Sequence, residues 1–369
     1  MNFEKLVRPC VLDLKAYVPG KPMEEVKREL GLSDIIKLAS NENPLGASPL
    51  AVAAMLREIQ ENVNYYPESL AHDLICALAE RYGLAADQFV LNNGADGIIT
   101  MLGMAFINPG EEAVMGELTF QAYSLITRKM DGRVVTVPLT ADGRLDVDGM
   151  LAAVTERTKF VFLCNPNNPT GTMITRAEFD RLIRGLPESV LLVSDEAYYE
   201  FADDPEYPQT LPYLKEFPNL VILRTFSKVM GLAGVRIGYG MAHPEIIRLL
   251  LKVREPFPVN RIAQAGALAS LADREFVKET LRVNRAGRAQ LTAGMRALGL
   301  RCLNSQTNFI FVDLGRPAQP VYQELLCRGI IVRPLGPMGS PNALRITIGT
   351  PEQNQRLLEV LGEVIAVAA

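Results

Sequence analysis

The sequence predicts an α/β protein with a large domain on a mostly parallel sheet and a smaller α+β domain. Through the middle of the chain, short runs that are apolar on both faces alternate with helical patterns. Strands have this composition when helices cover both faces of a parallel sheet. After about residue 260 the pattern changes to long helices, followed by a mixture of short strands and helices.

Seven apolar runs are predicted as strands of the large sheet. They are residues 88–94, 112–117, 133–139, 159–166, 189–197, 220–226 and 235–242. We expect helices between several of them, at 97–106, 146–155 and 175–184.

The last hundred residues predict the smaller domain. Residues 261–298 have the pattern of one or two long helices with many Arg. Three predicted strands, "TNFIFVDL", "GIIVRPL" and "ALRITIGT", then surround a helix near 318–328, and a final helix follows. We expect a large domain over 36–260 and a small domain made of 1–35 together with 261–369.

Composition excludes several classes of partner. The 369 residues are 48% hydrophobic, which is enough for one large core or two domains. The net charge is −4 and no basic tract indicates nucleic acid. No apolar run approaches the roughly 20 residues that cross a bilayer, and the first residues lack an apolar signal core. We therefore expect a cytoplasmic protein without a membrane partner.

The counts of Cys and His limit the chemistry. Five widely spaced Cys predict reduced, mostly buried thiols rather than a disulfide framework or a zinc site. With only His72 and His243, metal catalysis and Ser-His-Asp chemistry lack their usual groups, and we expect no metal. Proton transfer then falls to Lys, Tyr or carboxylates.

Polar residues follow four predicted strands at their carboxyl ends, where open parallel sheets bind ligands. These segments are "NNGADG", "NPNNPTG", "SDEAYYEF" and "RTFSK". The first is either a plain strand-to-helix turn or a phosphate site made of free N–H groups. The second can be a simple loop. In the third, Asp195 is either a helix cap or a buried carboxylate that needs a partner.

Lys228 lies in the apolar run "RTFSKVMGLAGVR", eight residues before Arg236. A Lys in an apolar pocket can lose its proton and act as an amine nucleophile, whereas a lone Lys is usually a surface residue. The phosphate-suited turn, the acid and a Tyr on the same rim favour the nucleophile. Pyridoxal phosphate would use all of these groups.

These motifs resemble the class I/II aminotransferases, which are fold-type I enzymes dependent on pyridoxal phosphate. "CNPNNPTG", "DEAY" and the Lys eight residues before Arg are specific for the superfamily, while "NENPLG" and "LRITIGT" resemble its histidinol-phosphate branch. The resemblance covers nearly the whole chain. It implies transfer of an amino group between histidinol phosphate and 2-oxoglutarate or glutamate, a step of histidine biosynthesis.

The resemblance also implies the roles of individual residues. Lys228 binds the cofactor covalently and moves protons, and Asp195 pairs with the pyridinium nitrogen. Asn168 and Tyr198 hydrogen-bond the phenolic oxygen of the ring. The remaining cofactor contacts are stacking by Phe120 and phosphate contacts from the backbone of Ala95 and Asp96, from Thr225 or Ser227, and from Arg236.

Substrate and subunit contacts follow from the same resemblance. Arg345, helped by Arg333 and Tyr17, holds the anionic group of the substrate, and Asn43 lies with them. Tyr66 reaches the cofactor phosphate of a neighbouring subunit, which implies a homodimer.

The chain departs from the family at Gly97, where many relatives have an acid, and at Leu118, where Pro is usual; Phe120 replaces a Tyr of some members. Three alternatives stay open: an aromatic-amino-acid aminotransferase, a threonine-phosphate decarboxylase and a non-catalytic binding module. A requirement for 2-oxoglutarate separates a transaminase from a decarboxylase.

Overall fold

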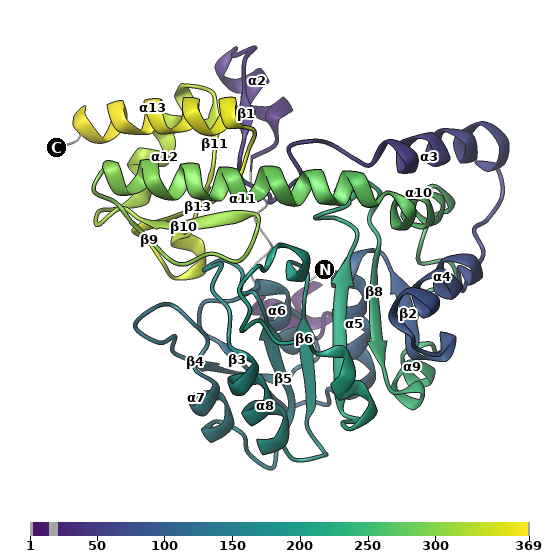
Figure 1. Cartoon of the computed structure of the whole chain (residues 1–369). Helices are drawn as coiled ribbons and strands as arrows, with labels where there is room; N and C mark the ends of the chain where they lie inside the picture. The colour runs from purple at the N-terminus through teal and green to yellow at the C-terminus, as the bar shows by residue number, and fades with distance from the viewer. Residues whose placement is uncertain (1–2, 15–20, 368–369) are drawn as a thin grey trace.

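The computed structural model describes residues 3–14 and 21–367, and its main body is built on a seven-stranded sheet (Figure 1). The strand order is β2-β8-β7-β6-β5-β3-β4, with only β8 antiparallel to its neighbours. All seven predicted strands are therefore confirmed. Their bounds are β2 Phe89–Asn92, β3 Glu112–Gly116, β4 Arg133–Val137, β5 Thr158–Cys164, β6 Leu191–Asp195, β7 Leu220–Thr225 and β8 Gly238–Ala242.

Helices cover both faces of this sheet, which explains why its strands are apolar at every position. In β5, Val161 and Leu163 enter one hydrophobic cluster, while Phe160 and Phe162 enter the cluster on the opposite face. The helices of this part are α3 Pro49–Asn62, α4 His72–Tyr82, α5 Gly94–Phe106, α6 Gln121–Lys129, α7 Val147–Ala152, α8 Arg176–Gly185 and α9 Pro244–Leu250.

A second, smaller sheet lies beside the first, with strand order β12-β13-β10-β9. The predicted strand "GIIVRPL" divides in two, because β11 pairs with β1 and β12 pairs with β13. The elements of this part are α2 Met23–Leu30, β1 Ile36–Lys37, α11 Arg274–Ala297, β9 Arg301–Cys302, β10 Phe309–Asp313, α12 Ala318–Cys327, β11 Ile330–Ile331, β12 Arg333–Pro334, β13 Ala343–Thr347 and α13 Pro351–Val367.

Separate hydrophobic clusters support a division into two domains, which we retain as a proposal. Val26 of α2 joins a cluster formed by α11, α12, α13 and the small sheet. Helix α10 (Arg261–Ala272), expected in the small domain, packs instead against α3 and α4 of the large one, with Ala263 and Ala267 in the large core. This packing favours a boundary near Asp273, where α10 meets α11.

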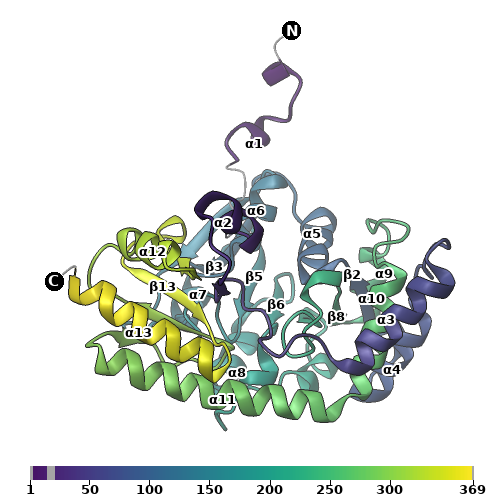
Figure 2. The ribbon, with the colours of Figure 1, turned by 90° about the horizontal axis from the view of Figure 1, so that it is seen from above.

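The first described segment, residues 3–14, has no side chain in either core. Helix α1 (Pro9–Leu12) lies beside α6 and away from the rest of the body (Figure 2). Among residues 3–14 and 21–367, no helix combines the length and apolar character that a membrane span requires.

A buried ion pair joins two adjacent strands, β6, which ends at the predicted catalytic acid Asp195, and β7, which precedes Lys228. Glu196, just after β6, accepts hydrogen bonds of 3.0 and 2.8 Å from the Arg224 guanidinium on β7, and both side chains are buried. Arg224 also lies over the ring of Tyr199, 3.6 Å from its centroid. Ser194 and Thr210 donate hydrogen bonds to the same carboxylate.

We expect Glu196→Gln to lower the free energy of unfolding by about 3–5 kcal/mol, because it leaves a buried guanidinium without its counter-ion. Urea unfolding of the two proteins measures this difference. The matched control is Glu245→Gln, which breaks an exposed pair with Arg248 and costs less than about 1 kcal/mol. Equal effects of the two substitutions would show that the buried pair adds nothing beyond a surface contact.

Candidate active site

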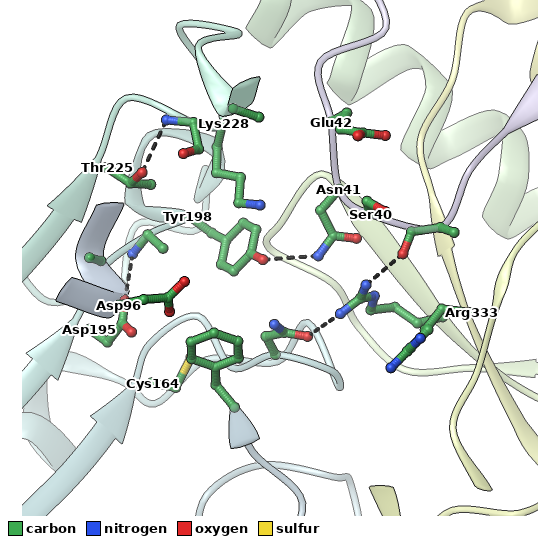
Figure 3. A pocket seen from close by; sticks show the side chains of 18 of the residues that line it. Ser40, Asn41, Glu42, Asp96, Cys164, Asp195, Tyr198, Thr225, Lys228 and Arg333 are labelled. Carbon is green, nitrogen blue, oxygen red and sulfur yellow. Dashed lines mark hydrogen bonds between the residues drawn. The ribbon is translucent and has the colours of Figure 1, made fainter. Parts of the chain in front are cut away.

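The carboxyl ends of three adjacent strands open into one cavity of about 320 Å³ (Figure 3). Cys164 ends β5, Asp195 ends β6 and Thr225 ends β7, and all three line the cavity. Strand register makes Cys164 and Asp195 direct neighbours. Residues 39–42 and the small sheet also line the cavity. The cavity therefore lies between the two cores.

Lys228 extends into this cavity from the segment that follows β7 (Figure 3). Its Nζ lies 5.5 Å from the centroid of the Tyr198 ring. Burial, together with the positive charge of Arg345, lowers the pKa of Lys228 to about 8. A substantial fraction of the amine is therefore neutral and nucleophilic near neutral pH.

Asp195 is a buried carboxylate without a cationic partner among the described residues. The hydroxyl of Tyr123 donates to its Oδ2 at 2.7 Å, and the N–H of Ala197 donates to Oδ1 at 3.2 Å. Burial nevertheless raises the pKa of Asp195 to about 6, because these two hydrogen bonds do not replace full solvation. Such a carboxylate favours a cationic N–H donor placed in the cavity.

The part of the cavity beside the start of α5 is suited to an anion. Helix α5 begins there at Gly94, and its next two residues, Ala95 and Asp96, line the cavity. The N-cap residue Asn93 makes no side-chain capping hydrogen bond. The guanidinium of Arg236 lies 3.5 Å from the hydroxyl of Ser227 and 3.5 Å from the Asp96 carboxylate. Gly94 has a φ of +76°, in the left-handed region that favours Gly, and a Cβ there would come within 2.4 Å of the flexible end of Arg236.

Two Arg residues form the side of the cavity that belongs to the small sheet. Arg333 on β12 and Arg345 on β13 are direct cross-strand neighbours. Arg345 is nearly buried, and it donates to Asn168 Oδ1 at 2.7 Å and to the Ala39 carbonyl at 2.7 Å. Both guanidinium groups therefore bring positive charge to the same side of the cavity.

Twelve of the predicted site residues line this single cavity, although their roles remain predictions. They are Ala95, Asp96, Phe120, Asn168, Asp195, Tyr198, Thr225, Ser227, Lys228, Arg236, Arg333 and Arg345.

Two of the predicted site residues that the structure describes do not line the cavity. Asn43 is directed elsewhere, because its amide donates to the carbonyl of Val229 and to the hydroxyl of Thr280. Tyr66 is 79% exposed and stacks on Phe257, with ring centroids 4.7 Å apart. Tyr17 lies outside the described residues.

Sequence analysis missed several residues of the cavity. Asn41 occupies the position expected for Asn43, two residues earlier in the same "SNENPLG" motif, and Ser40 and Glu42 lie beside it. Cys164 lines the cavity floor, and the phenol of Tyr123 holds Asp195 from behind. The "CNPNNPTG" motif could have indicated Cys164, but Tyr123 looks like any apolar residue of a helix.

Two of the three departures from the family pattern, Gly97 and Leu118, lie outside the cavity. A Cβ on Gly97 would lie 2.5 Å from Asn92 Oδ1, which accepts a hydrogen bond from the N–H of Asn93. Leu118 packs against Phe311 and Leu335 of the small domain. Neither residue lines the cavity that holds Lys228.

Comparison with known proteins shows which family has this fold and this cavity. The family model "Aminotransferase class I and II" matches residues 33–361. The chain belongs to this family, and its fold is that of the fold-type I aminotransferases, as predicted.

Similarity extends over the full length of individual relatives. The chain is 47% identical to histidinol-phosphate aminotransferase 2 of Pseudomonas fluorescens, over 100% of this chain and 99% of the relative. It is 46% identical to histidinol-phosphate aminotransferase of Moorella thermoacetica, over 97% and 93% of the two chains. The crystal structure of histidinol-phosphate aminotransferase from Sinorhizobium meliloti in complex with pyridoxal-5'-phosphate superposes with a TM-score of 0.90, at 30% identity and 98% coverage of both chains.

Proposed function

We propose that the protein is a pyridoxal-phosphate-dependent aminotransferase that moves an amino group between histidinol phosphate and 2-oxoglutarate or glutamate. The observation that carries the proposal is the placement of Lys228, Asp195 and Arg236 around one cavity, each with a different chemical character. The names of the full-length relatives support the choice of substrate.

The residues of the cavity fit pyridoxal phosphate. An amine of lowered pKa, a buried carboxylate of raised pKa and a cationic end with free helix N–H groups match its aldehyde, its pyridine nitrogen and its phosphate. When bound, the cofactor supplies an aldehyde that takes up the amino group and a ring that accepts electrons from the substrate carbon.

The chain's own residues supply positioning and proton transfer. Lys228, once its amine is released, moves a proton to and from the reacting carbon, a role suited to a pKa near 8. Asp195 keeps a negative charge behind the ring nitrogen, and Asn168 and Tyr198 contact the ring oxygen. Phe120 provides a flat apolar face, while Ser227, Thr225 and the backbone of Ala95 and Asp96 hold the phosphate with Arg236.

The paired Arg residues explain how one site can accept two different substrates. A planar guanidinium binds either a phosphate or a carboxylate through two parallel hydrogen bonds. Arg345 with Arg333 can therefore hold the phosphate of histidinol phosphate in one half of the reaction and a carboxylate of 2-oxoglutarate in the other.

An activity panel tests the proposal against its alternatives. The substrates are histidinol phosphate, phenylalanine, tyrosine and threonine phosphate, each with and without 2-oxoglutarate. We expect the highest kcat/KM with histidinol phosphate, and only when 2-oxoglutarate is present. Preference for phenylalanine or tyrosine would identify an aromatic aminotransferase, and turnover of threonine phosphate without an acceptor would identify a decarboxylase.

A homodimer in the cytoplasm completes the proposal, with Tyr66 reaching the partner's cofactor phosphate. Helix α3 and the segment after it support a subunit interface, because they expose a patch of large apolar side chains. These are Leu50, Val52, Leu56, Ile59, Val63, Tyr65 and Tyr66. A second cavity, of about 530 Å³, shares Asp96 and Arg236 with the first and is also lined by Phe257.

We expect Tyr66→Phe to weaken cofactor binding by about 1.5–3 kcal/mol, the range for a hydrogen bond to a charged group. Mixing this variant with the inactive Lys228→Ala variant shows whether Tyr66 serves the site of its own subunit or that of the partner. If Tyr66 acts across the interface, each mixed dimer has one intact site and activity recovers at limiting cofactor. Clear impairment of Tyr66→Phe without recovery on mixing would place Tyr66 in its own subunit's site.

A further inference from the structure

Asn41 has an unusual backbone conformation at the centre of the cavity wall. Its φ is +57°, in the left-handed region, and its side chain is 1% exposed. Asn tolerates this region better than most residues other than Gly, because its short side chain can hydrogen-bond locally. Outside Gly, a buried residue in this region persists only where its surroundings hold it firmly.

Thr347 of β13 and Asn308, which directly precedes β10, hold Asn41 through three hydrogen bonds. Its N–H donates to Thr347 Oγ1 at 2.9 Å, and its carbonyl accepts from Asn308 Nδ2 at 3.0 Å. The Thr347 hydroxyl in turn donates to Asn41 Oδ1 at 3.2 Å. Because the single proton of the Thr347 hydroxyl is donated to Asn41, the oxygen of the Asn41 amide faces Thr347.

The fixed amide determines the hydrogen-bond direction at Tyr198. With Oδ1 facing Thr347, Asn41 Nδ2 faces Tyr198 and donates to its phenol oxygen at 2.9 Å (Figure 3). The proton of Tyr198 is then available for an acceptor in the cavity, and none is found among the described residues. The ring itself is buried and packed edge-on against Phe309, 5.2 Å between centroids.

We infer that Asn41 is a positioning residue that keeps Tyr198 a hydrogen-bond donor toward the anionic ring oxygen of the cofactor. This inference rests on the proposed function. A donor to an anionic oxygen stabilises the deprotonated form, so it lowers the pH at which the bound chromophore loses its shared proton. Thr347 and Asn308 act further back, by fixing Asn41.

The test is a pH titration of the visible absorption band of the holoenzyme. Asn41→Gly removes the amide, while Gly accepts the left-handed backbone and retains both backbone hydrogen bonds. We expect Asn41→Gly to raise the midpoint of this titration by about half to one pH unit. Tyr198→Phe should raise the same midpoint further. Asn41→Asp, which cannot donate to Tyr198 when ionised, should raise it more than Asn41→Gly.

A double substitution separates positioning from general damage. In the Tyr198→Phe background, Asn41→Gly should produce no further shift, because the hydroxyl that it orients is absent. Thr280→Val is the matched control, since it removes a hydroxyl bonded to the same loop but remote from Tyr198, and its midpoint should equal that of the unmodified protein.

The inference is overturned by an unmoved midpoint in Asn41→Gly, or by the same shift with and without the Tyr198 hydroxyl. An unmoved midpoint in Tyr198→Phe also overturns it, yet leaves the aminotransferase assignment intact. A separate result would contradict the aminotransferase assignment: a visible absorption band that persists in Lys228→Ala.

Discussion

Replacing Lys228 with Ala is expected to abolish the visible absorption of the bound cofactor and to lower kcat by about 10⁴-fold or more. Lys228 is the one Lys among the described residues that lines the cavity, and its pKa of about 8 makes its amine available for covalent attachment. Ala removes both the point of attachment and the group that transfers protons.

Borohydride reduction followed by peptide mapping provides the measurement. The reduced cofactor should be found on the peptide that contains Lys228, and Lys228→Ala should give no labelled peptide. Lys252→Ala, which removes an exposed Lys outside the cavity, is the control and should behave like the unmodified protein. Label on any other Lys would show that the site is assigned wrongly.

Asp195→Asn is expected to retain the cofactor but to lower kcat/KM by about 10²–10³-fold, which corresponds to roughly 2.7–4 kcal/mol of transition-state stabilisation. The amide has the shape of the carboxylate and can accept a hydrogen bond, but it carries no charge. The ring nitrogen then loses its proton more readily, and the ring accepts electrons less well. Near-normal turnover would remove Asp195 from this role.

The same substitution should stabilise the cofactor-free protein. Burial raises the pKa of Asp195 to about 6, so its favourable contribution exists below about pH 4 and is lost as the pH rises through 6. Asp195→Asn should therefore raise the free energy of unfolding at pH 7 by about 1–3 kcal/mol and flatten its dependence between pH 4 and 6.

Asp203→Asn is the control in this experiment, because it should change the free energy of unfolding in the opposite direction. Burial raises the pKa of Asp203, but hydrogen bonds and charge from Arg288 and Arg285 outweigh burial and lower it overall. Its contribution is present above the usual Asp pKa and is lost as the pH falls, so Asp203→Asn should destabilise the protein at pH 7. If both substitutions destabilise equally, burial does not perturb Asp195 as described.

The large sheet could be predicted from sequence because its strands are buried on both faces. Continuous apolar runs such as 159–166 have no competing interpretation once helical patterns flank them. The domain boundary was harder to predict. The apolar face of α10 shows that the helix is half-buried, but not whether it packs on the large or the small core.

The part of the site at strand ends was also predictable, whereas the part formed by the small domain was not. Lys228 and Asp195 follow apolar strands directly, so their position in the fold follows from the strand itself. Asn41 depends on a hydrogen bond to Thr347, 306 residues later in the chain. Nothing local distinguishes Asn41 from Asn43, since the left-handed turn at Asn41 decides which of the two faces the cavity.

The half-reaction with histidinol phosphate alone tests the central claim most directly. Purified holoenzyme is mixed with histidinol phosphate in the absence of any acceptor, and the visible band is followed before and after addition of 2-oxoglutarate. We predict that the band is lost in proportion to the number of sites and returns when 2-oxoglutarate is added, with glutamate formed in equal amount. A band that is unchanged by histidinol phosphate, or that fails to return with 2-oxoglutarate, would contradict the account.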